Sequence, residues 1–100
     1  MLLAKVRGTV VSTCKEPSLS GVKFLMVQLL SDRGEPLPDY EVAADVVGAG
    51  VGEWVLIARG SGARQHEGYQ DRPVDATVIA IVDTVSLSSG SLYSKRDDFS

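Results

Sequence analysis

The sequence predicts an all-β protein, and three observations lead to this class. Short runs of alternating or wholly apolar residues recur along the chain, clusters of Gly, Pro, Ser and Asp separate them, and no segment has the pattern of a long helix. We identify five such runs within 100 residues. This pattern predicts a small, five-stranded, OB-like β-barrel with at most one short helix.

The first two predicted strands differ in how many of their faces are apolar. Leu2 to Thr13 alternates apolar with polar residues, which predicts one buried and one solvent-facing side. A loop at Cys14 to Gly21 separates it from Val22 to Leu30, which is apolar on both faces. We expect both faces of this second strand to be covered, either by another element of the chain or by a neighbouring subunit.

The next two predicted strands flank a glycine-rich segment. A turn at Ser31 to Gly34 precedes Pro36 and Pro38, which we expect to delay the return of the chain to the sheet. Tyr40 to Val46 then alternates as a third strand, and Trp54 to Ala58 is a short fourth strand that is apolar on both sides.

A fifth strand is predicted at Thr77 to Val85, where β-branched residues are dense. Before it, Ser61 to His66 has the pattern of one helical turn with Ser61 as its N-cap, and Pro73 to Ala76 is interpreted as a turn. Beyond it, Ser86 to Ser100 is poor in apolar residues and is predicted to be a mobile tail that docks through Leu92 and Tyr93. The predicted organisation is therefore a barrel domain over residues 1–86 and a partly docked or mobile tail over residues 87–100.

The composition favours assembly and argues against nucleic-acid binding. The hydrophobic fraction of 44% is rich for a small monomer. The net charge is −3 with a pI near 5.0, and the six aromatic residues are scattered singly, without interleaved Lys or Arg. An OB-type module for single-stranded nucleic acid, which needs stacking aromatics in a basic groove, remains the alternative interpretation. No apolar run approaches the roughly 20 residues of a membrane span, so we expect a soluble intracellular protein without a membrane partner.

The residues between Val47 and Arg64 contain five glycines around the fourth strand. Such a run resembles a phosphate-binding loop, but a dinucleotide fingerprint opens a helix and a P-loop contains Gly-Lys-Ser/Thr, and neither condition is met here. Tight turns around a core strand are the favoured interpretation. The third interpretation is that the glycines let identical backbones pack around a symmetry axis.

No catalytic constellation is evident, so we predict neither an enzyme nor a cofactor. Cys14 and His66 are the only cysteine and histidine, which excludes a disulfide within the chain and a Cys/His zinc site, and both are interpreted as non-catalytic. Asp45 and Asp83 each end a β-patterned run, and capping of turn amides is favoured over a carboxylate dyad. Arg59 and Arg64 bracket a glycine-rich segment, where an intersubunit salt bridge or bonds to carbonyl groups are favoured over an anion site.

Segments distributed over nearly the whole chain resemble one known family. They are KVRGTVVST at 5–13, KEPSLSGVKFL at 15–25, PDYEVAAD at 38–45, VGAG at 47–50 with EWVL at 53–56, RGS at 59–61 with AR at 63–64, and PVDA at 73–76 leading into IAIVDTV at 79–85. In this order they are similar to the EutN/CcmL family of bacterial microcompartment proteins. The KEPSLSGVK and DYEVAAD segments point to the β-carboxysome branch of that family.

The resemblance implies a structural protein without catalysis or cofactor. It implies an OB-like barrel that assembles as a ring of five and closes the vertices of an icosahedral carboxysome shell in the cytoplasm, built mainly of hexameric shell proteins. It further implies that subunit interfaces and a narrow axial opening are formed at or near one set of residues: Gly48, Ala49, Gly50, Glu53, Arg59, Gly60, Ser61, Ala63 and Arg64. A small-molecule enzyme that uses Cys14 or His66 is the third interpretation, after the nucleic-acid module.

Overall fold

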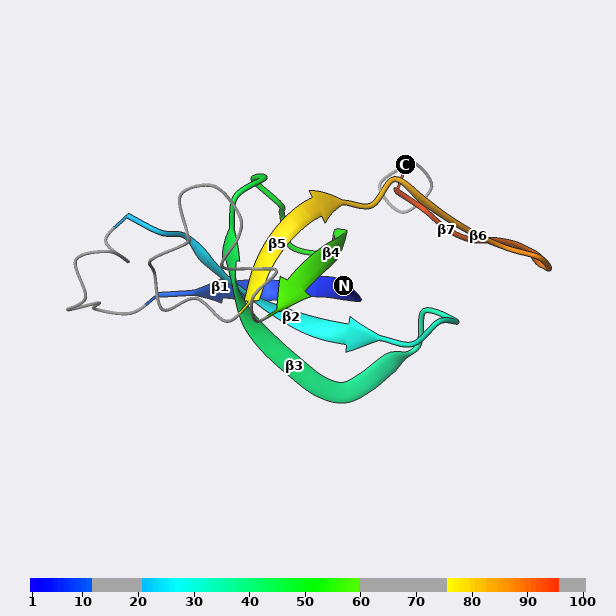
Figure 1. Cartoon of the computed structure of the whole chain (residues 1–100), viewed down its shortest axis with the longest axis horizontal. Helices are drawn as coiled ribbons and strands as arrows, with labels where there is room; N and C mark the ends of the chain where they lie inside the picture. Colours follow the sequence, from blue (N-terminus) through cyan, green and yellow to red (C-terminus); the bar gives the residue numbers. More distant parts are fainter. Residues whose placement is uncertain (12–20, 60–75, 96–100) are drawn as a thin grey trace.

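The computed structural model describes residues 1–11, 21–59 and 76–95, and every element in these ranges is a β-strand. Five strands form a closed barrel and two form a hairpin that projects from one end of it (Figure 1). The barrel strands are β1 (Leu2–Val10), β2 (Phe24–Leu30), β3 (Pro36–Asp45), β4 (Trp54–Arg59) and β5 (Ala76–Ile81), and the hairpin strands are β6 (Thr84–Leu87) and β7 (Gly90–Ser94). The predicted five-stranded all-β barrel is confirmed, while the helical turn predicted at Ser61 to His66 lies outside the described residues.

The barrel closes through one short parallel contact. Its strands follow the order β1-β2-β3-β5-β4, and β4 pairs with β1 to complete the circle. All neighbours are antiparallel except β3 and β5, which pair in parallel at Ala44 with Thr77 and at Asp45 with Val78. Irregularities in register after Val6, Gln28 and Leu56 increase the local bend of the strands, as bulges do, and help so few strands to curl into a barrel.

The core is built from the inward faces of these strands. The alternating pattern predicts this face correctly in β1, but in β3 Tyr40 and Val42 point outward and Ala43 enters the core. The inward side chains of β2 are Leu25, Val27 and Leu29, and they are buried against residues of the other four strands. The other face of the same strand points outward, and Met26 is 40% exposed there. The two apolar faces of β2 are therefore one core face and one outward face, which is open at Met26 and covered at Leu30, where Trp54 and Tyr93 pack.

The prediction that two prolines delay β3 is wrong, because the strand begins at Pro36 itself. Proline lacks the N–H group that a central ladder needs, but β5 pairs with β3 only at Ala44 and Asp45, so the first half of β3 is a sheet edge where proline fits. The side-chain amide of Gln28 donates a 2.9 Å hydrogen bond to the Leu37 carbonyl, which spans the irregular register at this point.

The prediction that one strand runs from Thr77 to Val85 is also wrong. The chain leaves the barrel after Ile81, and β6 and β7 pair as an antiparallel hairpin whose turn contains Gly90 at φ 130°. Residues that the sequence predicted to belong to a mobile tail therefore form most of this hairpin. A second hydrophobic cluster anchors it: Leu30, Trp54 and Tyr93, with Leu3, Val82, Val85 and Leu92 packed against them. Leu92 and Tyr93, the residues predicted to dock the tail, both belong to this cluster. Residues 96–100 lie outside the described residues.

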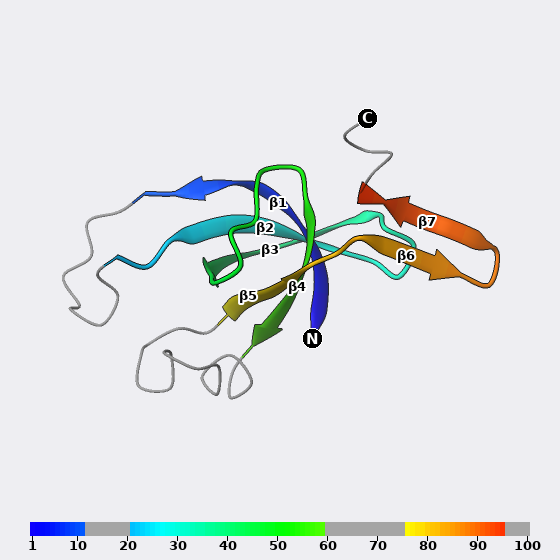
Figure 2. The same ribbon diagram turned by 90° about the horizontal axis from the view of Figure 1, so that it is seen from above.

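Figure 2 shows that the hairpin extends on the same side of the barrel as the turn between β2 and β3. Gly34 of that turn, at φ 76°, lies against the ring of Trp54. Within the described residues, no helix is long and apolar enough to cross a membrane.

Candidate functional site

The connection between β3 and β4, residues 46–52, is called the glycine turn here, and a buried carboxylate organises it. Asp45 accepts hydrogen bonds from the backbone amides of Val47 at 3.1 Å, Gly48 at 3.0 Å and Ala49 at 3.1 Å. Its side chain is 1% exposed, and Lys23 approaches it at 3.5 Å from the surface. The prediction that Asp45 caps turn amides is confirmed, and the capping fixes the path of the chain as it leaves the barrel.

A second carboxylate completes the glycine turn. Glu53 accepts a 2.6 Å hydrogen bond from the amide of Gly50. With the Asp45 contacts, the four successive amides from Val47 to Gly50 are all bonded to carboxylates of the same chain. A phosphate loop needs such amides free for its ligand, so these four amides are not available to cradle a phosphate.

The glycines have different roles within the turn. Gly48 and Gly52 adopt φ values of 77° and 93°, which side chains rarely tolerate, whereas Gly50 has no positive φ. Ala49 is 1% exposed and packs in the barrel core, so it anchors the turn from inside. Gly48 and Gly50 are exposed on the outer side. The turn therefore presents bare backbone outward and one methyl group inward.

Two valines accompany this bare backbone. Val47 and Val51 are exposed, the latter at 61%. The residues predicted for the site included the glycines but not these two side chains. Their exposure could have been predicted from the sequence, because an apolar residue in a tight surface turn has no core to pack against.

Glu53 also connects the turn to the C-terminal hairpin. Its second carboxylate oxygen lies 2.8 Å from the ammonium group of Lys95, the residue after β7. The hydrogen bond from Lys95, and then the Gly50 amide, lower the pKa of the Glu53 carboxyl below its ordinary value. The same contact raises the pKa of Lys95. Beside this ion pair, Trp54 stacks on Tyr93 with ring centroids 4.2 Å apart and an interplanar angle of 10°.

The outward face of β2 and β3 carries an apolar strip, which we call the outer strip: Phe24, Met26, Tyr40 and Val42. Met26 and Val42 are opposite each other in the ladder, and Met26 is opposite Gly8 on its other side. Because Gly8 has no side chain, that residue cannot shield Met26 from the β1 side. Val42 is 42% exposed and Tyr40 is 64% exposed. Apolar side chains clustered on one sheet face are typical of an interaction surface.

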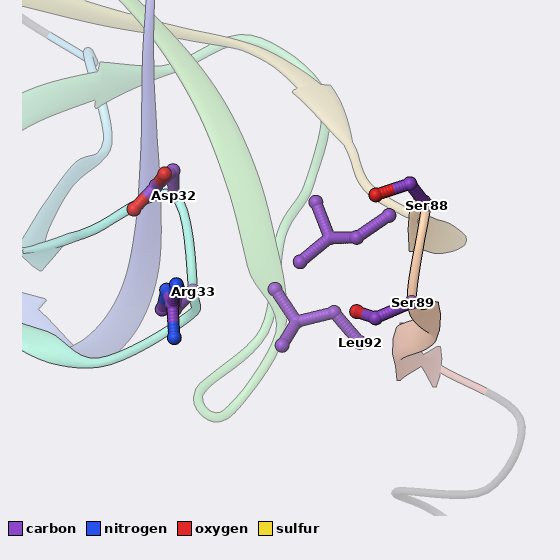
Figure 3. Close-up of a pocket in the computed structure, with 6 residues that line it drawn as sticks. Asp32, Arg33, Ser88, Ser89 and Leu92 are labelled. Atoms are coloured by element: carbon purple, nitrogen blue, oxygen red, sulfur yellow. The ribbon is translucent and has the colours of Figure 1, made fainter.

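A shallow cleft of about 570 Å³ lies between the β2–β3 turn and the hairpin. Figure 3 shows Asp32 and Arg33 on one side of it and Ser88, Ser89 and Leu92 on the other. Both charged residues are exposed to solvent. Among the described residues that line the cleft, Asp32 is the one carboxylate, and the two serines are accompanied by neither histidine nor cysteine.

Comparison with known proteins places the chain in a family. The family model described as ethanolamine utilisation protein EutN/carboxysome matches residues 1–83. The chain belongs to the EutN/CcmL family. It is 65% identical over 98 residues, 98% of each chain, to the carboxysome shell vertex protein CcmL of Synechocystis sp..

Solved structures of EutN/CcmL relatives have the same fold. The structure of Gloeobacter violaceus CcmL superposes with a TM-score of 0.92 at 63% identity and covers 97% of this chain and 100% of that one. The GrpN pentameric microcompartment shell protein from Rhodospirillum rubrum superposes with a TM-score of 0.79 at 48% identity, over 87% of this chain and 99% of that one. The family resemblance expected from the sequence is confirmed over nearly the full length.

Within this EutN/CcmL barrel, the predicted site residues are partly brought together. Arg59 forms an ion pair with Glu41 of the same chain, which links the end of β4 to β3. Glu53 borders the glycine turn. The remaining candidates, Gly60, Ser61, Ala63 and Arg64, and also Cys14 and His66, lie outside the described residues. In the ranges that the structure does describe, no group of three or more His, Cys, Asp or Glu residues is placed to hold a metal ion.

Proposed function

We propose that this chain is a structural vertex protein of a carboxysome shell, which assembles as a homopentamer and has no catalytic activity. The observation that carries the proposal is the 65% identity, over 98% of both chains, to a protein named carboxysome shell vertex protein. The GrpN protein, a pentameric microcompartment shell protein that shares the fold over 87% of this chain, supports the pentameric state. The protein would act in the shell of a compartment within the cytoplasm.

The geometry of a ring supports this proposal. A closed ring of five uses a heterologous contact, so every copy needs two different patches that meet each other. The described surface offers two: the outer strip, and the exposed side of the glycine turn with Val47 and Val51. We assign these two patches to the contact between copies. Each would be covered in the ring, which accounts for the second apolar face of β2.

The glycine turn suits close contact between backbones. A Cβ atom at Gly48 would meet no heavy atom within 4 Å inside the chain, and the residue is exposed. Its bare surface therefore leaves room for a neighbouring copy, and its position is fixed by Asp45 from within. Besides these two patches, the proposed contact and axial opening include the residues that the resemblance implies, with Ala49 acting from inside the barrel: Gly48, Ala49, Gly50, Glu53, Arg59, Gly60, Ser61, Ala63 and Arg64.

The mechanism is geometric. Hexameric shell proteins tile a flat layer, and a five-fold unit inserted among them introduces the curvature that closes a polyhedron. The proposed partners are therefore four further copies of this chain and the surrounding hexameric shell proteins. A closed vertex would also limit the leakage of small molecules.

Native mass spectrometry of the purified protein at several concentrations tests the proposal. We expect a discrete assembly of five chains of 10.6 kDa each. In cells, deletion of the gene should give elongated or unclosed shells. A monomer at every concentration, or normal icosahedral shells in the deletion strain, would contradict the proposal.

A further inference from the structure

Two adjacent residues, Glu53 and Trp54, connect parts of the chain that are far apart in sequence. On one side, Glu53 holds the amide of Gly50 in the glycine turn at 2.6 Å. On the other side, it contacts Lys95 at 2.8 Å, while Trp54 stacks on Tyr93. One carboxylate thus contacts the glycine turn with one oxygen and the base of the hairpin with the other.

We infer that Glu53 couples the β6–β7 hairpin to the glycine turn, so that docking of the hairpin orders the surface that the turn presents to a second copy. The coupling itself is a property of the single chain. Only the last step, presentation to a second copy, rests on the proposed vertex function. Glu53 acts here as a positioning residue.

The position of Lys95 depends on the hairpin being docked. The backbone amide of Lys95 donates a 2.8 Å hydrogen bond to the carbonyl of Asp83, which joins the two ends of the hairpin at its base. The backbone amide of Val82 donates a 2.8 Å bond to the carbonyl of Trp54, which fixes that base to β4. When the hairpin leaves the barrel, Lys95 leaves with it.

The position of Glu53 depends in turn on Lys95. A free glutamate side chain samples several rotamers, and most of them direct its carboxylate away from Gly50. The ammonium group of Lys95 selects the rotamer in which the other oxygen accepts from the Gly50 amide, and a charged acceptor makes this a strong hydrogen bond. The facing charged groups are Asp45, which disfavours the Glu53 carboxylate, and Asp83, which favours the Lys95 ammonium.

The other end of the turn has its own support. The amides of Val47, Gly48 and Ala49 are held by Asp45, whose nearby cation is Lys23 on the barrel. The hairpin contributes nothing to those three contacts. The coupling therefore predicts an effect that is local to the Gly50 amide, since Gly52 is held to β1 by its bond to the Val6 carbonyl, while Val47 to Ala49 act as an internal reference.

Amide hydrogen exchange followed by NMR tests the coupling in the full chain. In Lys95→Met, which keeps the apolar stem and removes the charge, we expect Gly50 to exchange about two- to fivefold faster, the range that a partly exposed ion pair supports. Val47 to Ala49 should keep their wild-type rates. Because exchange is base-catalysed, loss of a nearby positive charge alone would slow it, so faster exchange reports opening of the contact.

A double-mutant cycle separates coupling from independent effects. Glu53→Gln should also speed Gly50 exchange, in part because a nearby negative charge is lost, so the decisive quantity is the further effect of adding Lys95→Met, which should be small. Glu41→Gln is the matched control, since it removes the same charge from the ion pair with Arg59 and lies in neither the turn nor the hairpin. Unchanged Gly50 exchange in Lys95→Met, or additive effects in the cycle, would overturn the inference. If Glu53→Gln fails to fold, Lys95→Met against Glu41→Gln decides alone.

The native mass of each variant keeps this inference separate from the vertex proposal. A monomeric wild type with coupled exchange would contradict the vertex function and leave the coupling intact. A pentameric wild type in which Lys95→Met leaves Gly50 unchanged would contradict the coupling alone. If both hold, Lys95→Met should weaken the pentamer relative to the wild type.

Discussion

Two apolar patches on the described outer surface of the barrel differ in what covers them. Around Trp54, the C-terminal hairpin folds back so that Tyr93 and Leu92 cover the patch, and Trp54 is almost fully buried. On the outer strip, Met26 and Val42 stay more than a third exposed. The patch around Trp54 therefore forms a second hydrophobic core, whereas the outer strip remains open to solvent among the described residues.

This contrast separates stability of the fold from stability of the assembly. A patch covered within the chain contributes to folding of every monomer, whereas an open patch contributes only when a second copy binds. Substitutions at the two patches should therefore change different observables.

The largest effect is expected from Trp54→Ala. The substitution removes the stack on Tyr93 and the centre of the second hydrophobic cluster, and loss of a large buried aromatic residue costs about 3–5 kcal/mol. Denaturant unfolding followed by circular dichroism, at fixed protein concentration, measures it. A loss well below this range would mean that the hairpin is not part of the folded core.

The second-largest effect is expected from a substitution in the outer strip. Met26→Asp should leave the monomer folded but oppose assembly by about 3 kcal/mol, because it places an unpaired carboxylate where a second copy is proposed to bind. Val11→Asp, at a position 93% exposed, is the matched control. Native mass spectrometry at decreasing protein concentration compares the pentamer stability of the two variants. Equal pentamer stability in both variants would remove the outer strip from the proposed contact.

A smaller effect is expected where the hairpin cluster meets the β2–β3 turn. A Cβ atom at Gly34 would lie 2.6 Å from the Trp54 ring and 3.3 Å from Leu92, while at Gly21, with a similar φ, it would meet nothing within 4 Å. Gly34→Ala should therefore destabilise the fold by about 1–3 kcal/mol more than Gly21→Ala, since backbone strain is common to both. Urea midpoints of the two variants give the difference. Equal urea midpoints would show that the side chains of the cluster can move aside for the added methyl group without loss of stability.

The smallest effect concerns the ion pair that joins the two regions. The pKa of Glu53 is lowered from 4.5 by Lys95 and by the Gly50 amide, so its contribution to stability is present above pH 4.5 and is lost as the pH falls through the lowered folded value. Glu53→Gln should remove that part of the acid-induced loss, about 0.5 kcal/mol for a solvent-screened pair. Unfolding curves at neutral pH and below pH 4.5 give the slope of the unfolding free energy against pH for both proteins. A slope equal to that of the wild type would contradict the role of the pair.

Much of the barrel was predictable from local sequence. Alternation identified the inward residues Ala4 and Val6 of β1, and the density of β-branched residues identified β5. In β3 alternation was misleading, because Tyr40 and Val42 of its apolar series face outward and Ala43 is the core residue. The capping role of Asp45 was also predictable, because an aspartate two to four residues before free amides in a turn has few other partners. The two apolar faces of β2 indicated in advance that one of them would need a cover from outside the barrel core.

The tertiary structure decided the features that depend on distant contacts. Ser86 to Ser94 has little apolar content of its own and forms a hairpin because Tyr93 packs on Trp54, about forty residues earlier. Pro36 could enter β3 only because β5 leaves that edge unpaired. The inward position of Ala49, the pairing of Arg59 with Glu41, and the link from Gly50 through Glu53 to Lys95 each depend on how separate segments meet in space. Periodicity within a segment reports which face is apolar, but which partner covers that face is set by the closure of the barrel.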